Sequence, residues 1–336
     1  MKKLKVAILG VTGAVGQEFL RILEQRRFPI ETLKLLASGR SAGKKIDFMG
    51  KTYEIEEAKP SSFDGLDLVL SSAGGAVSRS LASSITRAGA LMVDNTSAFR
   101  MDPEVPLVIP EINPEDISKH KGVIANPNCS TIIMLVPLFP IHKVAGIKRI
   151  IAATYQAASG AGAKAMEELE TQARDFLAGK KVTPKVLPHQ IAFNVFSHNS
   201  KIGPDGCCEE ETKMVNETKK IFHAPKIQVT ATCVRVPVLR AHSEALFVET
   251  EKKITPEEAR DLLSKASGVK VIDDRDKNYF PMPLEATGQD DVLVGRLRAD
   301  PSVANGLAMF VSGDQIRKGA ALNAVQIAEI AFDIQR

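Results

Sequence analysis

The chain has 336 residues and a formal net charge of +4 at pH 7, from 44 basic and 40 acidic side chains. Hydrophobic residues make up 44% and charged residues 25%, a globular composition that excludes a disordered or fibrous protein. At roughly 150 residues per domain the length predicts about two domains. The mild, scattered positive charge does not indicate a nucleic-acid partner.

The N-terminus imitates a signal peptide, with three lysines beside a mostly apolar stretch at 6–16. Three glycines in that stretch and the charged segment at 17–27 argue against this interpretation. No apolar run approaches the roughly 18–20 residues that span a bilayer. We therefore expect a cytoplasmic protein without a membrane partner.

The first part of the chain alternates strands and helices. Apolar runs predict strands at 5–9, 33–37, 66–71 and 91–94, and helices at 14–26 and 77–87. This alternation is typical of α/β proteins with a doubly wound, Rossmann-type parallel sheet.

The pattern changes after Asn126 and predicts a second, α+β domain whose sheet mixes strand directions. Strands are expected at 147–156, 227–234 and 245–250, and helices at 163–178, 209–222 and 255–266. The helix at 255–266 begins with Thr255 as its cap and Glu258 at the capping-box position. A last helix at 318–334 should return to cover the first sheet. The expected domains are therefore 1–128 with 315–336, and 129–314.

A glycine-rich turn follows the first strand and opens the first helix. Its Gly-x-x-Gly-x-x-Gly spacing lets backbone N–H groups approach a pyrophosphate, so it indicates a dinucleotide site (Gly10, Thr12, Gly13, Ala14, Val15 and Gly16). The second strand ends without the carboxylate that usually binds the ribose 2′-OH of NAD. Ser38, Arg40 and Ser41 stand there instead, and an arginine suits a 2′-phosphate, so we expect NADP. The alternative is that Arg40 is a solvated turn residue.

Cys129 is the candidate nucleophile. It lies in the segment Asn-Pro-Asn-Cys-Ser-Thr at 126–131, where a helix would begin, and a helix N-terminus favours the thiolate over the thiol. The alternative is a buried structural cysteine. Cys207 and Cys208 in a turn, and Cys233 in a strand, are interpreted as structural; a vicinal disulfide between the first two would be strained. No metal is expected, because no Cys-x-x-Cys or His-Glu-x-x-His spacing occurs.

A dinucleotide loop and a reactive thiol suggest a reaction class in which a thiolate adds to an aldehyde, hydride leaves to NADP and an acyl-thioester remains. Such chemistry needs an acid–base group. His242 is the candidate among six histidines, because it follows Arg235 by seven residues in an otherwise apolar segment. The other histidines lie in charged or loop contexts and are interpreted mostly as surface residues.

Several segments together resemble aspartate-semialdehyde dehydrogenase, over essentially the whole chain and in the order of that family. They are GVTGAVG at 10–16, SAFRMD at 97–102, VIPEIN at 108–113, NPNCST at 126–131, TYQAASGAG at 154–162, CVRVPVLRAHS at 233–243 and SGDQIRKGAALNAVQIAE at 312–329. Ala241 stands where other members can have Gly, Ser or Cys before the histidine.

The resemblance implies residue roles. Cys129 would form the acyl-enzyme, His242 would be its acid–base partner and Gln156 would place the reacting carbonyl. Arg235 would bind the substrate carboxylate and Glu210 the substrate amino group. Arg100 and Lys213 would bind phosphate. The NADP contacts would come from the glycine loop, from Arg40 and Ser41, and from Ser159, Gly160 and Gln315.

The implied activity is the NADP-dependent reductive dephosphorylation of L-4-aspartyl phosphate to L-aspartate 4-semialdehyde, in lysine, methionine and threonine biosynthesis. The resemblance also implies a homodimer formed through the second, catalytic domain. Two alternatives remain open: another acyl-phosphate reductase, such as N-acetyl-glutamyl-phosphate reductase, and a non-catalytic NADP-binding sensor.

Overall fold

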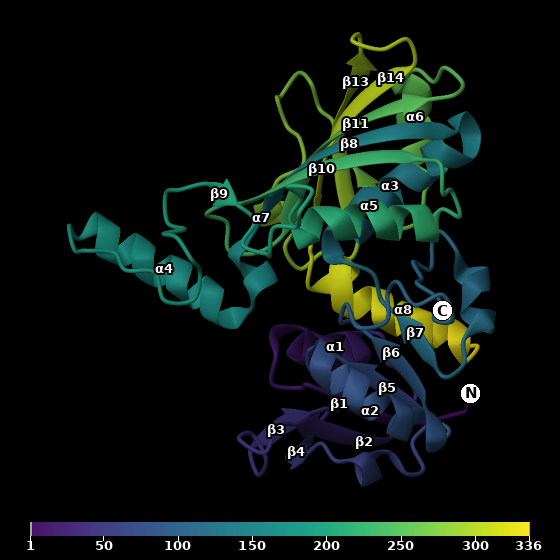
Figure 1. The fold of residues 1–336 in the computed structure, drawn as a ribbon, viewed down its shortest axis with the longest axis vertical. Helices are drawn as coiled ribbons and strands as arrows, with labels where there is room; N and C mark the ends of the chain where they lie inside the picture. The colour runs from purple at the N-terminus through teal and green to yellow at the C-terminus, as the bar shows by residue number, and fades with distance from the viewer. Residues whose placement is uncertain (1, 336) are drawn as a thin grey trace. The chain divides into compact units, whose positions relative to one another are not determined.

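The computed structural model describes residues 2–335, and these divide into two compact units, each with its own sheet (Figure 1). Of the described residues, the first unit comprises 2–128 and 320–335, and the second comprises 129–319. Residues 315–319, expected in the first domain, group with the second unit, where the backbone N–H groups of Arg317 and Gly319 bond to the carbonyl of Asp314. Among the described residues, no helix has the length and apolar character that crossing a bilayer requires.

The first unit is a doubly wound sheet, as the alternating pattern predicts. Its seven strands lie in the order β3-β4-β2-β1-β5-β6-β7, all parallel except for the β3–β4 hairpin. The elements are β1 (Leu4–Leu9), α1 (Ala14–Gln25), β2 (Ile30–Ala37), β3 (Lys45–Phe48), β4 (Lys51–Glu57), β5 (Leu68–Ser71), α2 (Gly75–Arg87), β6 (Leu91–Asp94), β7 (Val123–Ala125) and α8 (Leu322–Ala331).

The last helix returns to the first unit and packs on α1, β5 and β6, which confirms the expectation for the C-terminal segment. It starts at Leu322 rather than Lys318, because residues 317–321 form a turn of π-helix. A bidentate ion pair joins it to the end of α1: Arg26 donates from Nε to Glu329 Oε1 at 2.9 Å and from Nη2 to Oε2 at 2.6 Å.

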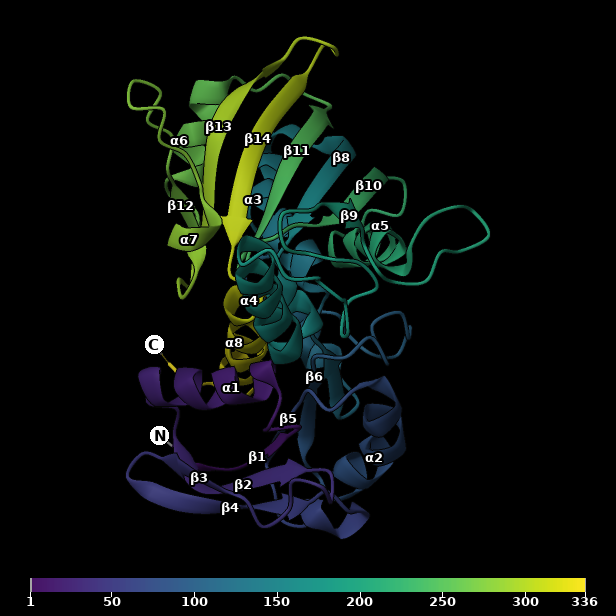
Figure 2. The same ribbon diagram turned by 90° about the vertical axis from the view of Figure 1, so that its left-hand side faces the viewer.

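The second unit is built on a mixed sheet, as predicted, with the strand order β12-β13-β14-β11-β8-β10-β9 (Figure 2). Helices α3, α5 and α6 cover one face of it. The elements are α3 (Cys129–Ala145), β8 (Ile147–Gln156), α4 (Ala163–Leu177), β9 (Phe196–Ser197), α5 (Glu209–Ile221), β10 (Gln228–Arg235), β11 (His242–Thr250), α6 (Pro256–Leu263), β12 (Val269–Val271), α7 (Pro283–Ala286), β13 (Val292–Asp300) and β14 (Gly306–Gly313).

The chain order places a switch point at the carboxyl end of β1. From β1 the chain passes through α1 to β2 on one side, and later continues from β5 to β7 on the other side. In open α/β sheets ligands bind at such a point, because the two connections leave a crevice between them. The glycine loop lies there, directly after β1.

Two glycines of the loop stand where the backbone packs too closely for a side chain. Gly10 has a φ of 90°, and a Cβ there would lie 2.6 Å from the carbonyl oxygen of Ser72. A Cβ on Gly16 would lie only 2.3 Å from the carbonyl oxygen of Gly10. A Cβ on Gly13, the N-cap of α1, would be 3.4 Å from the same oxygen, which is ordinary contact. The first and last glycines of the loop are therefore required by packing, and the middle one is not.

We predict that Gly16→Ala destabilises the protein by about 1–3 kcal/mol, the usual cost of overpacking, because backbone atoms must move. Gly13→Ala is the matched control in the same loop and should leave the urea unfolding midpoint nearly unchanged. Equal midpoints for the two variants would contradict the packing argument.

Candidate active site

Three strands of the second unit bring three of the expected site residues to one edge of the sheet. Gln156 ends β8 and Arg235 ends β10, and the two pair directly in the parallel register. His242 begins β11, whose Ser243 pairs with Tyr155 of β8, so the histidine lies beside Gln156. All three side chains are buried. Residues separated by almost ninety positions in sequence thus form one polar row on the face that α3 and α5 cover.

Cys129 is the first residue of α3, as the sequence indicates, and its side chain is half-buried. The next residue, Ser130, accepts a hydrogen bond from Gln156 Nε2 at 2.9 Å, which joins the start of the helix to the polar row. Gly319 was not predicted as a site residue. A Cβ at that position would lie 3.0 Å from Cys129 Cβ, so a larger residue would crowd the thiol.

The imidazole of His242 is held in one tautomer. The backbone N–H of Ala157 donates to Nδ1 at 3.0 Å, so a neutral ring carries its proton on Nε2. Complete burial, together with the charge of Arg235, lowers the pKa of His242 well below its usual value. Nε2 has no hydrogen-bond partner within residues 2–335, and a Cβ on Gly160 would lie 3.0 Å from it. At neutral pH His242 is therefore an N–H donor rather than a ready base.

Glu210 and Lys213 lie on one face of α5, as their spacing predicts, with Lys213 Nζ 3.7 Å from Glu210 Oε2. The other carboxylate oxygen of Glu210 accepts from Gln156 Nε2 at 3.3 Å. Glu211 fixes the start of the helix, because it accepts from the backbone N–H groups of Cys208 at 2.8 Å and Cys233 at 3.0 Å. The second unit thus groups the candidate nucleophile Cys129, the neutral His242, the amide of Gln156 and the charged side chains of Glu210 and Lys213.

Three of the expected cofactor residues also form one group in the second unit. Gln315 Nε2 donates to Ser159 Oγ, and Gln315 Oε1 accepts from the backbone N–H of Ala241 at 2.8 Å. Ala241 has a φ of 72°, a backbone conformation that favours glycine. Gly160 follows Ser159, and a Cβ there would lie 2.9 Å from Nη1 of Arg235 and 3.0 Å from the His242 ring, so only glycine leaves room for these two side chains.

The first unit holds the remaining expected residues. Ser38 and Arg40 are exposed in the turn after β2, and the carbonyl of Ser38 accepts from the N–H of Ser41 at 2.9 Å. Arg100 lies in the loop after β6 and is buried. Its Nε donates to the carbonyl of Asn126 and its Nη2 to that of Asn95, both at 2.9 Å.

Two predictions for individual side chains need correction or completion. His198, interpreted as a surface residue, is half-buried against Arg235: the guanidinium Nη2 lies 2.8 Å from its Nε2. None of the four cysteines, all within the described residues, forms a disulfide. The only sequence signal for a functional role of His198 is that polar residues, Asn199 and Ser200, follow it, and this signal is weak.

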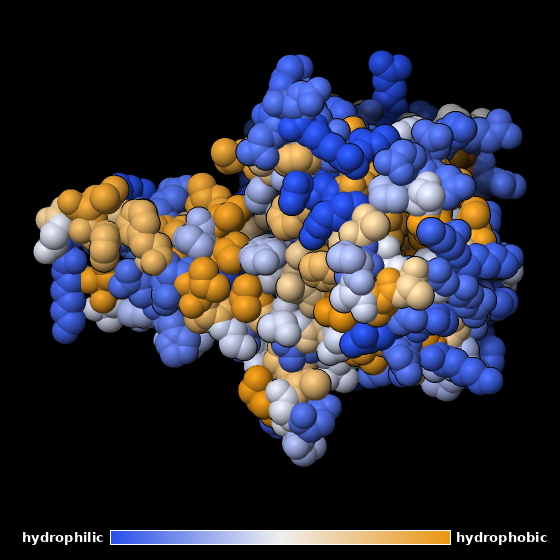
Figure 3. Space-filling model, turned by 90° about the horizontal axis from the view of Figure 1, so that it is seen from above, coloured by the Kyte–Doolittle hydropathy of each residue, from blue (hydrophilic) through white to orange (hydrophobic). Residues whose placement is uncertain are grey.

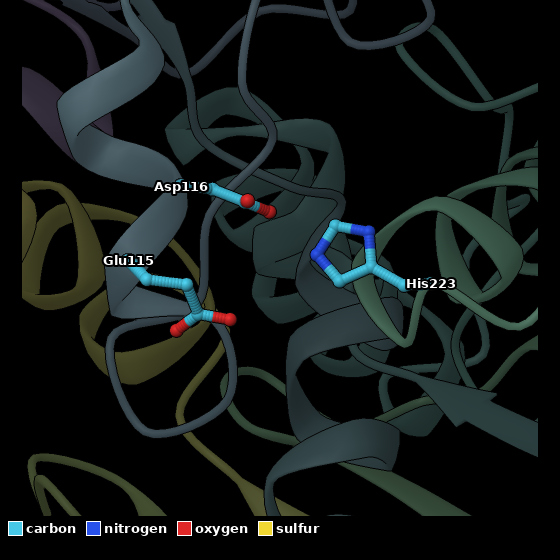
Figure 4. A group of neighbouring side chains, drawn as sticks. All are labelled: Glu115, Asp116 and His223. Atoms are coloured by element: carbon cyan, nitrogen blue, oxygen red, sulfur yellow. The ribbon is translucent and has the colours of Figure 1, made fainter.

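Glu115 and Asp116 belong to the 3-10 helix Pro114–Lys119 of the first unit (Figure 4). Asp116 accepts from Asn113 Nδ2 at 2.8 Å and from Lys119 Nζ at 2.5 Å, so neighbours in its own unit use its carboxylate. His223, also shown, follows α5 in the second unit. We assign no metal to these side chains.

Comparison with known proteins identifies the family. The model of the semialdehyde dehydrogenase NAD-binding domain matches residues 5–120, and that of the semialdehyde dehydrogenase dimerisation domain matches residues 138–318. The aspartate-semialdehyde dehydrogenase of Synechocystis sp. is 60% identical over 330 residues, which cover 98% of each chain. This chain belongs to the aspartate-semialdehyde dehydrogenase family. The family assignment makes it an oxidoreductase.

Other members agree with this assignment. The aspartate-semialdehyde dehydrogenase of Aquifex aeolicus is 54% identical over 97% of each chain. The crystal structure of aspartate semialdehyde dehydrogenase II from Vibrio cholerae has a TM-score of 0.96 and 44% identity, and the match covers 100% of both chains. Membership of this family confirms the predicted fold class of a Rossmann-type domain with a second α+β domain.

A buried carboxyl group, Glu244, lies one row further from the sheet edge than His242. It pairs with Thr154 of β8 and Val311 of β14 and is completely buried. Neither of its oxygens has a hydrogen-bond partner in the described part of the chain. Burial, with the nearby Glu210 carboxylate, raises the pKa of Glu244 well above its usual value. Glu244 is therefore protonated in the folded protein, because an unpaired buried charge is too costly.

We predict that Glu244→Gln stabilises the protein increasingly as the pH rises. The unfolded glutamate loses its proton near pH 4.3, whereas the folded one keeps it, so wild-type stability falls above that pH by at most about 1.4 kcal/mol per pH unit. Glutamine does not titrate. Urea unfolding at pH 5 and pH 8 should show a larger advantage for the variant at pH 8. Glu249→Gln, on the same strand but partly exposed, is the control, and a pH-independent difference would refute the interpretation.

Proposed function

We propose that the protein is an NADP-dependent aspartate-semialdehyde dehydrogenase that works through a thioester on Cys129. In the biosynthetic direction it would convert L-4-aspartyl phosphate to L-aspartate 4-semialdehyde and phosphate. The observation that carries this proposal is the grouping, within one unit, of a thiol at a helix N-terminus with Gln156, Glu210, Arg235 and a neutral His242.

The first unit has features that fit a dinucleotide. Helix α1 begins at Gly13 with no side-chain cap and no acidic residue in its first turn, so its N–H groups suit a pyrophosphate. Arg40 is exposed where a 2′-phosphate would lie. When bound, NADP would supply the hydride acceptor or donor. A relative from Candida albicans, 26% identical over 98% of each chain and with a TM-score of 0.76, was solved with NADP.

In the direction of aldehyde oxidation, the Cys129 thiolate attacks the aldehyde carbon and a carbon–sulfur bond forms. The N-terminal turn of α3 favours the thiolate. The N–H of His242 Nε2 donates a hydrogen bond to the oxygen as it becomes negative, which stabilises the tetrahedral state. Hydride loss restores the carbonyl as a thioester. Phosphate then attacks this carbon, the carbon–sulfur bond breaks and the thiolate is released.

The charged side chains suit a substrate that carries both a carboxylate and an ammonium group. Arg235 would bind the carboxylate and Glu210 the ammonium group, while Arg100 and Lys213 would bind the phosphate. A relative from Vibrio cholerae, aspartate semialdehyde dehydrogenase II, is 44% identical to this chain and was solved in complex with ASA. This complex supports the proposal that the present chain binds the same substrate.

A homodimer through the second unit is part of the proposal. The outer face of its sheet carries Tyr155, which is 40% exposed and lies 6.1 Å from Phe310, ring to ring. A second group of exposed apolar side chains lies on α4 and the segment after it, which project to the left in Figure 3. Its exposed residues are Phe176, Leu177, Val186, Phe193, Val195 and Ile202. The match to a dimerisation domain supports a second copy as the partner. Cytoplasmic location and a role in lysine, methionine and threonine biosynthesis complete the proposal.

The test measures the rate of phosphate-dependent NADP reduction with aspartate 4-semialdehyde as the substrate. The same rate is measured with N-acetyl-glutamate semialdehyde for comparison. Cys129→Ala should abolish turnover and leave folding and NADP binding intact. A preference for the N-acetylated substrate would indicate a different acyl-phosphate reductase. NADP binding without turnover of either would indicate a sensor.

Iodoacetamide should modify Cys129 first and in proportion to the loss of activity. Cys207 is more exposed, but Asp205 raises the pKa of its thiol, so it should react slowly. Cys207→Ala is the control and should be inactivated at the wild-type rate. Labelling of Cys207 before Cys129, with activity retained, would exclude Cys129 as the nucleophile.

Arg40→Ala should weaken NADPH binding by about 10- to 150-fold, the value of a charge-assisted hydrogen bond, and leave NADH binding nearly unchanged. Only NADPH has the 2′-phosphate. Lys44→Ala, also exposed in the segment after β2, is the matched control. Dissociation constants from fluorescence titration give the answer, and equal losses for the two cofactors would contradict the role of Arg40.

A further inference from the structure

The guanidinium of Arg235 is held by three acceptors of the second unit. Nη1 donates to the carbonyl of Ala157 at 2.9 Å. Nη2 lies 2.8 Å from His198 Nε2 and donates to Asn199 Oδ1 at 3.0 Å. A guanidinium has five N–H donors, so three are accounted for and two are left, one on Nε and one on Nη1. Within residues 2–335, Nε is buried without a hydrogen-bond partner.

One of the residues that hold Nη2 is itself fixed by the sheet. The short strand β9 pairs with the end of β10, where Phe196 lies opposite Arg235. The chain then continues with His198, whose backbone N–H donates to the carbonyl of Cys233 at 2.8 Å. His198 therefore directly follows β9 and is tied to β10 by its backbone, and Asn199 lies in the exposed bend that comes next.

His198 must be neutral to accept from Arg235, because a guanidinium can only donate. Nε2 then carries the lone pair and Nδ1 the proton, which can be donated to Ser200 Oγ at 3.0 Å. The backbone N–H of Ser200 also lies 3.2 Å from Nδ1, but the shorter, charge-assisted contact with Arg235 decides the tautomer.

The surroundings keep His198 neutral. Burial is the main cause that lowers the pKa of His198 to about 4, and the positive charges of Arg235 and Lys213 act in the same direction. Glu210 and Glu211 oppose them. At pH 6–8 the ring is uncharged and can accept.

We propose that His198 and Asn199 are positioning residues for Arg235, which hold Nη2 so that the guanidinium keeps one orientation and its unpaired Nε–H is preset for an oxygen of the substrate carboxylate. This inference rests on the proposed role of Arg235 in substrate binding. The physical reason is that an arginine side chain loses conformational freedom when it is fixed. If the protein fixes the side chain before the substrate binds, this loss of conformational entropy does not reduce the affinity for the substrate.

The test compares two variants of His198. His198→Leu removes the acceptor, and the KM for aspartate semialdehyde should rise about tenfold while the KM for phosphate changes less than twofold. His198→Gln offers an amide oxygen in place of Nε2 and should recover most of the loss. His189→Gln is the control, because His189 packs against Phe196 of the same segment but is not a ligand of Arg235.

A double-mutant cycle shows whether His198 acts through Arg235. In an Arg235→Lys background, which should itself raise the KM for the semialdehyde, His198→Leu should add less than a twofold change. Thermal unfolding followed by circular dichroism checks that each variant is folded. If His198→Leu unfolds the protein, His198→Gln and Asn199→Ala carry the test: the first should keep a near-normal KM and the second should raise it.

The outcomes separate this inference from the proposed function. Wild-type protein without phosphate-dependent turnover of aspartate semialdehyde would overturn both. Normal turnover with an unchanged KM in Arg235→Lys would overturn the role of Arg235 and the inference with it. A raised KM in Arg235→Lys, with equal losses in the two His198 variants, no loss in either, or an undiminished effect in the lysine background, would overturn the inference alone.

Discussion

The amide of Gln156 is the hydrogen-bonding centre on which the second unit's site depends. Its Nε2 lies within hydrogen-bond distance of Ser130 Oγ at 2.9 Å, Thr154 Oγ1 at 3.3 Å and Glu210 Oε1 at 3.3 Å. These acceptors come from α3, β8 and α5. One buried amide group with two hydrogens thus links α3, which begins with Cys129, and α5, which carries Glu210, to the sheet, and an unpaired amide there would be costly.

Burial sets the protonation states around that centre. Desolvation favours the uncharged forms of His198, His242 and Glu244, and each has a different geometric consequence. His198 becomes a hydrogen-bond acceptor for the Arg235 guanidinium, and His242 becomes an N–H donor. Glu244 becomes a neutral carboxylic acid one row further along the sheet. Charge is kept on Arg235, whose pKa is lowered by burial but starts far above neutrality. The remaining charges interact strongly with a charged ligand, because little solvent screens them.

Local patterns predicted most of the first unit and part of the second. The strand at 91–94 and the strand at 147–156 have the predicted bounds, since the first is a short, fully buried apolar run and the second a longer, mostly apolar segment that begins directly after Gly146. Strands β3, β4, β7, β9 and β12 to β14 were not predicted from the sequence. For β3 and β4 the reason is visible: most of their residues are exposed, so no apolar run marks them, and the hairpin forms through Met49 and Gly50, both at positive φ. Helix α3 was recognised by its start but not its extent, because Pro137 and Pro140 interrupt an apolar run.

The sequence by itself determined the chemistry-bearing residues that stand in short, distinctive segments: the glycine loop, Cys129 at a helix start, the Glu210–Lys213 pair and the Arg235–His242 segment. Each of these is specified by neighbours within one or two turns of chain. Only the tertiary structure decided that Gly319 leaves room for Cys129, that Gly160 lies against the His242 ring, that His198 contacts Arg235 and that Glu244 is a buried acid. These contacts join residues that are far apart in the sequence. His198 and Arg235, for example, are separated by 37 positions. No local pattern encodes them, because they depend on strand register and on which polar groups the packed sheet removes from water.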